Sequence, residues 1–310
     1  MEVPRLEAFL EVARLGSMRA AARSLHLGQP ALSARIVALE DELDAKVFER
    51  TKRGVHLTLA GRALMPYAER ALEAIEAGRA AVSQVEQGDD GELVIAAAGA
   101  INASVVPELV ARFRRYHPGV HLYVHTGSAA RITELVAYGT AQVGLIREAA
   151  PSRDPRLRVT PLYDEQLALA ARPEHPFVAE GPISISRLAD ATLIFYDRGS
   201  DDYQLSQSLL KEADVVPYGV IEVDSVDTAR RLVARGLGVA LLPSTAAVPG
   251  FEAGSLAPVG LTDVPILLRR IVALERAEAS TWAPVETLHG LLRDVASFVP
   301  GASLIADGGV

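Results

Sequence analysis

The chain contains no cysteine among its 310 residues, and aromatic residues make up only 5%. The absence of cysteine excludes disulfides, thiolate metal sites and cysteine-based catalysis or redox sensing. Few aromatics among 49% hydrophobic residues predict aliphatic cores. No apolar run approaches the roughly eighteen residues of a spanning helix, and the start MEVPRLEAFLEVARLG lacks the layout of a signal peptide. We therefore expect a cytoplasmic protein that does not contact a membrane.

Charge is distributed unevenly along the chain, whose net charge is −8. Residues 1–88 hold 12 basic and 12 acidic residues, so the negative excess comes from the 19 basic and 27 acidic residues beyond them. Between positions 46 and 62, a single acid, Glu49, stands among five basic residues: Lys46, Arg50, Lys52, Arg53 and Arg62. A basic patch on a neutral module indicates DNA contact at one end of the protein, although a solvated surface turn has the same composition.

The sequence divides into three zones. Residues 1–57 have the pattern of short helices followed by a turn-rich stretch, and 58–88 that of one long helix. At Gly88-Asp89-Asp90-Gly91 the pattern changes to short apolar runs that alternate with helices, as in an α/β domain over 89–310. The expected fold class is therefore mixed, an all-α head and linker helix followed by an α/β domain.

The first zone has the pattern of a helix-turn-helix followed by a hairpin. Ser17 is placed to cap a second helix, and His26-Leu27-Gly28 forms a tight turn before a third. The third helix has an apolar stripe, and its opposite face carries Gln29, Ser33 and Arg35, which are able to enter a major groove. The stripe consists of Leu32, Ile36, Leu39 and Leu43. Residues 47–57 then predict a two-stranded hairpin whose basic tip acts as a wing on DNA.

These residues closely resemble the N-terminal domain of LysR-type transcriptional regulators. The match runs nearly without gaps from Leu6 to Leu64, and it extends more weakly to about residue 297. The motifs at the family's spacing are Gln29-Pro30-Ala31-Leu32-Ser33, Leu39-Glu40, Leu43, Phe48-Glu49-Arg50 and Leu57-Thr58-x-Ala60-Gly61. The resemblance implies a winged helix-turn-helix at 1–57 that binds double-stranded DNA at a pseudo-palindromic operator.

The third helix departs from the family pattern in ways that reduce its charge. Gly28 replaces the usual capping hydroxyl, and Ala34 stands where a basic residue is common. We therefore expect affinity to depend more on the hairpin. The expected DNA contacts are Gln29, Pro30, Ala31, Ser33, Arg35, Arg50, Lys52 and Arg53.

The long helix over 58–88 has a heptad pattern. About thirty residues at ~1.5 Å each span roughly 45 Å, and small or apolar residues recur at alternating spacings of four and three. They are Leu64, Ala68, Ala71, Ile75, Gly78, Val82 and Val85. The pattern fits a dimerising seam, and it also fits a helix packed on its own domain. The resemblance implies that this helix pairs two subunits and that dimers assemble into tetramers.

Beyond Gly91 the pattern predicts two α/β lobes with mostly parallel sheets. Two strand-helix-strand units place Ser128 and Ser225 at helix N-termini, and the chain crosses between the lobes near Thr160 and Pro265. The first lobe is expected over about 91–160 and 266–299, and the second over about 161–265. The resemblance implies a periplasmic-binding-protein-like domain with a small-molecule effector in the interlobe cleft.

The expected effector contacts lie after strands and at helix N-termini of both lobes. They are Ala98, Ala100, Asn102, Ser128, Tyr196, Arg198, Ser200, Tyr203 and Thr228. Free helix N–H groups together with Arg198 favour an anion such as a carboxylate. Against this, Asp201 and Asp202 are able to neutralise Arg198, which also fits a surface ion pair. Ser128 and Ser225 fit simple helix caps equally well.

Other function classes have weaker support in the sequence. No catalytic or nucleotide-binding motif appears, so no enzyme and no cofactor are expected. A metal site at His117, His121 and His125 is conceivable, although surface strand positions explain them. A transport-type binding protein and a purely architectural DNA-binding protein remain alternatives. If the chain is an activator, RNA polymerase is an expected partner. Effector identity, target genes and the sign of regulation stay open.

Overall fold

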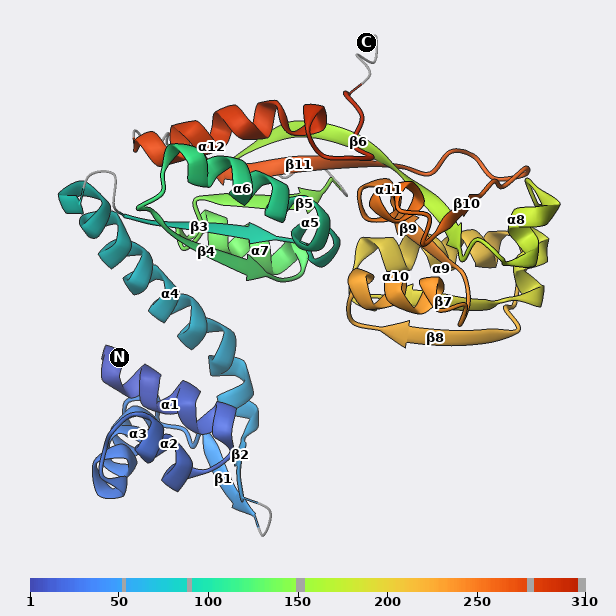
Figure 1. The fold of residues 1–310 in the computed structure, drawn as a ribbon. Coiled ribbons are helices and arrows are strands. Elements are labelled where there is room, and N and C mark those ends of the chain that lie inside the picture. Colours follow the sequence, from blue (N-terminus) through green and yellow to red (C-terminus); the bar gives the residue numbers. More distant parts are fainter. Residues whose placement is uncertain (52–53, 88–90, 149–153, 278–281, 306–310) are drawn as a thin grey trace. The chain divides into compact units, whose positions relative to one another are not determined.

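The computed structural model describes residues 1–51, 54–87, 91–148, 154–277 and 282–305. The chain divides into two compact units, Met1–Ala81 and Val82–Val310. Both are drawn in Figure 1. No helix in the described ranges is long and apolar enough to span a membrane.

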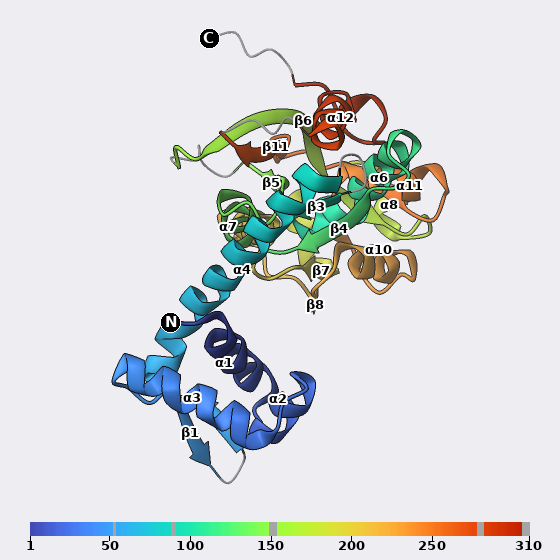
Figure 2. The same ribbon diagram turned by 90° about the vertical axis from the view of Figure 1, so that its left-hand side faces the viewer.

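The first unit consists of short helices, a hairpin and most of the long helix that follows it (Figures 1 and 2). Its elements are α1 (Val3–Leu15), α2 (Met18–Ser24), α3 (Gln29–Leu43), β1 (Phe48–Thr51), β2 (Gly54–Leu57) and α4 (Leu59–Gln87). The Ser17 hydroxyl accepts a hydrogen bond from the Ala20 N–H, 3.3 Å away, which confirms the expected cap of α2. Thr58 likewise accepts from the Gly61 N–H at 3.1 Å, at the start of α4.

The core of this unit forms where the faces of α1 and α3 meet. Phe9, Leu32 and Leu39 are completely buried, so the apolar stripe expected in the third helix does face the core. The hairpin is tied to the end of α1 because the Val55 N–H donates to the Gly16 carbonyl at 3.0 Å. Gly16 has the left-handed conformation that ends α1.

The start of α4 packs into the same core. Ala68 is 1% exposed, and Leu64 and Ala71 pack against the cluster built by α1 and α3. The heptad seam needs a correction here, because a buried Ala68 is not available to a second subunit. The small side chains of Ala68 and Ala71 allow the helix to approach its own domain closely. Ile75 is half-buried, and the side chains of Val82 and Val85 lie outside the described residues.

The second unit has two lobes joined by long strands. The first lobe contains β3 (Glu92–Ala97), α5 (Gly99–Ser104), α6 (Val106–Tyr116), β4 (His121–Thr126), α7 (Ala129–Ala137) and β5 (Val143–Arg147), and later β11 (Leu268–Arg276), α12 (Ala283–Arg293) and the 3-10 turn η3 (Val295–Ser297). The second contains α8 (Pro176–Glu180), the 3-10 turn η2 (Ile185–Asp190), β7 (Thr192–Tyr196), α9 (Asp201–Glu212), β8 (Gly219–Val223), α10 (Val226–Ala234), β9 (Ala240–Pro243), α11 (Ser244–Glu252) and β10 (Ala257–Val259). The strand β6 (Leu157–Ala171) runs through both lobes (Figure 1).

The sheet order is β10-β6-β11-β5-β3-β4, with β9 also paired to β6. The pairs β3–β4, β3–β5 and β7–β8 are parallel, as expected. In contrast, β11 pairs antiparallel with both β5 and β6, and β6 pairs antiparallel with β9 and β10. The expectation of mostly parallel sheets is therefore wrong for the crossing strands, because a chain that leaves a lobe and returns beside its exit runs in opposite directions.

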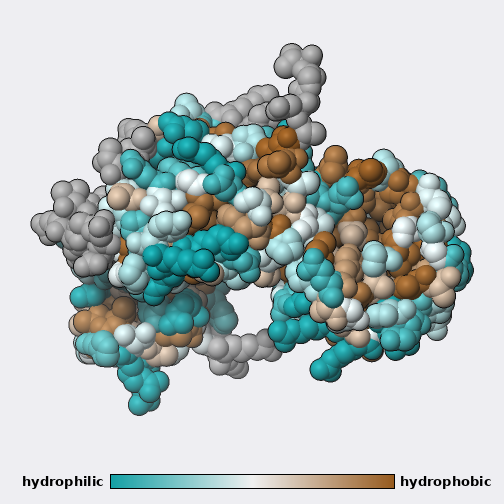
Figure 3. All heavy atoms as spheres, turned by 45° about the horizontal axis from the view of Figure 1, so that its top comes forward, coloured by the Kyte–Doolittle hydropathy of each residue, from teal (hydrophilic) through white to brown (hydrophobic). Residues whose placement is uncertain are grey.

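Each lobe has its own aliphatic core. In the first lobe, Leu109 and Phe113 of α6 pack with Leu288 of α12 above the sheet, while α7 covers the opposite face (Figure 1). The short helix α5 also contacts the second lobe, where Ala100 belongs to the cluster around α10 and α11. On the face shown in Figure 3, hydrophobic surface is more extensive over the second lobe than over the first.

Candidate functional sites

The first two turns of α3 carry five side chains that are exposed or half-buried. Gln29, Pro30 and Ala31 are exposed, and Ser33 and Arg35 are half-buried. Gly28 precedes the helix in an extended conformation, and no side chain caps the first turn. These five side chains lie in the first two turns of α3, and they are suited to a major groove and its phosphates. We call this set of side chains the recognition surface.

The hairpin stands next in the chain as β1 and β2, in the register Phe48↔Leu57 to Thr51↔Gly54. The tip residues Lys52 and Arg53 and the side chain of Arg50 lie outside the described residues. Two other basic residues of the expected patch bond to the protein itself. Lys46 forms an ion pair with Glu40 at 2.7 Å, and Arg62 donates to the Leu57 carbonyl at 2.8 Å.

Glu40 fixes the junction between α3 and the hairpin. Its carboxylate is 7% exposed and accepts hydrogen bonds from the N–H groups of Val47 at 3.1 Å and Phe48 at 3.4 Å. The hydrogen bond with Glu40 also raises the pKa of Lys46. This geometry explains physically why an acid stands at the end of the expected recognition helix, since backbone groups at the turn need a buried acceptor.

A cavity of about 100 Å³ lies between the two lobes of the second unit. Its walls come from the strand ends and helix starts of both lobes, and they consist of Ala98, Gly99, Ala100, Gly127, Ser128, Ala129, Arg147, Tyr196, Asp197, Gly199, Ser200, Asp202 and Arg269. Ser128 caps α7 by accepting from the Arg131 N–H, and Ser200 caps α9 by accepting from the Tyr203 N–H. We call this the interlobe cavity.

The structure brings five of the expected effector contacts together around this cavity, namely Ala98, Ala100, Ser128, Tyr196 and Ser200. The others lie outside its walls. Asn102 donates to Thr126 at 2.8 Å, the Tyr203 hydroxyl donates to Glu222 at 2.7 Å, and Thr228 is exposed on α10.

The expected role of Arg198 needs a correction. Its side chain is 73% exposed and forms an ion pair with Glu222 on the neighbouring strand β8. Asp202 does not neutralise it, since Asp202 bonds to Arg269 instead. Arg198 therefore belongs to the surface of the second lobe, where an ion pair adds little to stability.

Four charged residues at the cavity were missing from the expected set: Arg147, Asp197, Asp202 and Arg269. Arg147 ends β5 and Asp197 directly follows β7, so the rule that ligands bind at strand ends could have found both. Arg269 comes from a crossing strand, and no local pattern indicated it.

Arg269 is the centre of a buried polar network on β6 and β11. Its guanidinium lies 3.2 Å from Glu165 and 2.9 Å from Asp202, and all three side chains are almost completely buried. The Thr245 hydroxyl donates to Glu165 at 2.7 Å. Burial raises the pKa of Glu165, and nearby Arg269 opposes that shift. One guanidinium thus balances two carboxylates where the lobes join.

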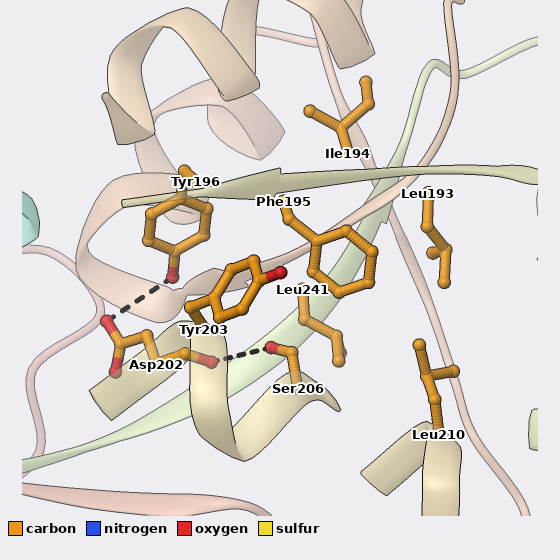
Figure 4. Close-up of a pocket in the computed structure, with 9 residues that line it drawn as sticks. All are labelled: Leu193, Ile194, Phe195, Tyr196, Asp202, Tyr203, Ser206, Leu210 and Leu241. Carbon is orange, nitrogen blue, oxygen red and sulfur yellow. Dashed lines mark hydrogen bonds between the residues drawn. The ribbon is translucent and has the colours of Figure 1, made fainter. Parts of the chain in front are cut away.

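Behind this network the second lobe contains a further, smaller cavity of about 10 Å³ (Figure 4). Aliphatic and aromatic side chains line most of it, and the Tyr196 hydroxyl points to Asp202 at 3.5 Å. A volume of this size has room for about one water molecule. It is therefore too small for an effector.

The histidines expected near one strand do not converge. His117 contacts Thr287 at 2.8 Å and His121 contacts Glu92 at 2.7 Å. Within the described ranges, no three side chains of metal-ligating type gather into a site.

Comparison with protein families gives two matches that together span most of the chain. The model of the bacterial regulatory helix-turn-helix protein, lysR family, matches residues 4–62. The model of the LysR substrate binding domain matches residues 86–297. The recognition surface lies within the first match, and the interlobe cavity lies within the second.

Several regulators resemble the chain along most of its length. The SDS degradation transcriptional activation protein of Pseudomonas sp. is 30% identical over 97% of this chain and 99% of its own length. The HTH-type transcriptional regulator TfdS of Cupriavidus pinatubonensis is 32% identical over 80% of this chain and 84% of its own length.

Solved structures agree with the sequence comparisons. Full-length CbnR in complex with its target DNA has a TM-score of 0.69 at 25% identity, covering 96% of this chain and all of CbnR. A full-length variant of OxyR from Pseudomonas aeruginosa has a TM-score of 0.62 at 25% identity, covering 100% of this chain and 99% of that protein. The expected fold class is confirmed, and this chain belongs to the LysR family of DNA-binding transcriptional regulators.

Proposed function

We propose that the chain binds a pseudo-palindromic operator as a dimer, and as a tetramer of two dimers, and that a small molecule in the interlobe cavity controls it. The observation that carries the proposal is that one chain holds both an exposed recognition surface on α3 and a cavity walled by two lobes. The part of α4 beyond Ala71 supplies the pairing helix, since Leu64, Ala68 and Ala71 serve the core of the first unit.

The mechanism by which a ligand controls DNA binding follows from the position of the cavity between two lobes. A ligand that contacts both lobes favours the lobe arrangement that fits it, and differential affinity for two arrangements shifts their populations. In an assembled regulator, such a shift moves paired DNA-binding heads and thereby changes DNA bending. Where the regulator activates, contact with RNA polymerase follows from the same movement.

The cavity favours an anionic group, such as a carboxylate, at one wall. The N-terminus of α7 lies at this wall, where Ser128 begins the helix and lines the cavity. The Arg147 side chain lies on the same wall as α7. We therefore place the anionic group of the effector near Ser128 and Arg147.

The proposal is tested by footprinting the purified chain on DNA upstream of its own gene and the divergent neighbour, across salt concentrations. We expect a protected pseudo-palindrome with steep salt dependence. Arg35→Ala should weaken binding by about tenfold or more because it removes an expected base contact, and Ser33→Ala should weaken binding less.

The matched control is Arg5→Ala, since Arg5 is also an arginine of the head but pairs with Glu42 at the other end of α3. We expect this variant to bind DNA nearly as well as the unaltered chain. Equal losses for Arg5→Ala and Arg35→Ala would show that net charge, rather than the recognition surface, determines binding.

A further inference from the structure

Asp197 has an unusual backbone for an aspartate. Its φ of 50° is left-handed, a conformation that non-glycine residues rarely adopt and that occurs often at ligand sites. The Asp197 N–H donates to the Val223 carbonyl at 2.8 Å, and its carbonyl accepts from the Ser200 N–H at 2.7 Å. The turn between β7 and α9 is therefore held on both sides, and it directs this residue to the interlobe cavity.

The Asp197 carboxylate reaches across to the first lobe. A methyl group placed on Gly99, in the first turn of α5, would lie 3.4 Å from Asp197 Oδ2. The side chain is half-buried, and among the described residues no hydrogen bond or ion pair reaches it. A carboxylate in such a position keeps its charge at a cost unless a cationic partner arrives.

The surrounding charges make the wall formed by the second lobe acidic. Asp202 and Glu165 share the single guanidinium of Arg269, and Asp224 lies beyond the end of β8. Burial, and then repulsion from Asp202 and Asp224, raise the pKa of Asp197. The wall formed by the first lobe has the opposite character, because it carries Arg147 and the N-terminus of α7.

We propose that the effector is a small zwitterion, such as an amino acid, whose ammonium group pairs with Asp197 while its carboxylate faces Arg147 and α7. This inference rests on the proposed effector role of the interlobe cavity. A cavity of about 100 Å³ limits the ligand to a small molecule. A simple carboxylate would occupy the wall of the first lobe and leave the half-buried Asp197 on the other wall without a cationic partner.

The test measures binding to the full chain by calorimetry with three matched sets of probes. The first set is the twenty amino acids, the second is the same acids without the amine, and the third is the corresponding amines without the carboxylate. We expect at least one amino acid to bind tenfold or more tightly than both of its matched analogues. Asp197→Asn should remove this preference and lower the affinity of the chain for that amino acid at least tenfold.

Two further variants separate ligand recognition from folding. Glu174→Gln removes an exposed acid elsewhere in the second lobe and should leave the affinity unchanged. Arg147→Gln, on the first lobe, should lower the affinity for the amino acid while leaving the affinity for the matched amine unchanged. This variant therefore tests the proposal even where Asp197→Asn does not fold.

Two results would overturn the proposal that the effector is a zwitterion while leaving the cavity as the effector site. One is preferential binding of the amine-free acids, and the other is an affinity for the amino acid that Asp197→Asn leaves unchanged. Binding of no probe from any set would also overturn it. The footprint tests operator binding, and the calorimetry tests the zwitterionic effector. Failure of one proposal can therefore be distinguished from failure of the other.

Discussion

Arg269→Met should lower the free energy of unfolding of the second unit by about 3–5 kcal/mol, the usual cost of removing one partner from a buried ion pair. Arg269 is 2% exposed, and its loss leaves Glu165 and Asp202 buried without their cation. The single tryptophan of the chain, Trp282, packs against the core of the first lobe. Its fluorescence during urea unfolding of the full chain therefore reports on this unit.

Arg270→Met is the matched control on the same strand. Arg270 is 40% exposed and pairs with Asp164, so its loss should cost under about 1 kcal/mol. Equal losses at the two positions would show that the buried network contributes no more than a surface pair.

The loss of stability caused by Arg269→Met should also depend on pH, and its direction can be stated. Because burial raises the pKa of Glu165 above its ordinary value of 4.5, its protonated form favours the folded state. That contribution is fully present below the unfolded pKa, and it is lost as pH rises through the folded pKa. Removing Arg269 strengthens the shift, so the variant should lose less stability at pH 5 than at pH 8.

Gly61→Ala is the second substitution from which we expect a large effect. It should lower the free energy of unfolding of the first unit by about 3 kcal/mol, because the added methyl group overpacks the site. A Cβ at Gly61 would lie 2.2 Å from the Val47 carbonyl oxygen and 2.8 Å from Leu57 Cδ2. The backbone cannot easily move aside, because the Thr58 N–H donates to that same carbonyl and the Thr58 hydroxyl donates to the Lys46 carbonyl at 2.6 Å. Circular dichroism during thermal unfolding of the full chain measures the loss, and operator binding should fall with it.

Gly290→Ala makes the same change inside another helix, α12, and serves as the control. Among the described residues, no side chain and no other segment of the chain lies within 4 Å of a Cβ at Gly290. Alanine is the better helix former by about 1 kcal/mol, so this variant should be as stable as the unaltered chain or more so. A loss at Gly290 that matches the loss at Gly61 would mean that placing alanine inside a helix, rather than the contact with Val47, explains both.

The local sequence predicts the DNA-binding head well because its signals are short-range. Leu32, Ile36 and Leu39 lie one helical turn apart, so their spacing shows directly which face is buried. Caps such as Ser17 depend on partners three residues away. The heptad of α4 was harder to interpret, because a small residue such as Ala68 suits either a partner helix or the helix's own core.

The charged lining of the cavity depends on pairing between distant segments. Arg198 finds Glu222 only because β7 and β8 pair in the register Phe195↔Glu222. Arg269 meets Glu165 because β11 returns beside β6 in the register Arg269↔Glu165. Neither register follows from periodicity, so the sequence indicated the strand ends near the cavity without showing which charges meet there.

The path of β6 and β11 also determines the order in which a growing chain can complete its parts. Every contact within the first unit is available once residue 81 has been synthesised. The first lobe must wait, because the edge of β5 is covered by β11 and its core needs Leu288 and Val299. Domains generally form as units during synthesis, from the N-terminus onward. A chain whose synthesis ends before β11 therefore contains every residue of the first unit, whereas the first lobe of its second unit cannot complete its sheet or its core.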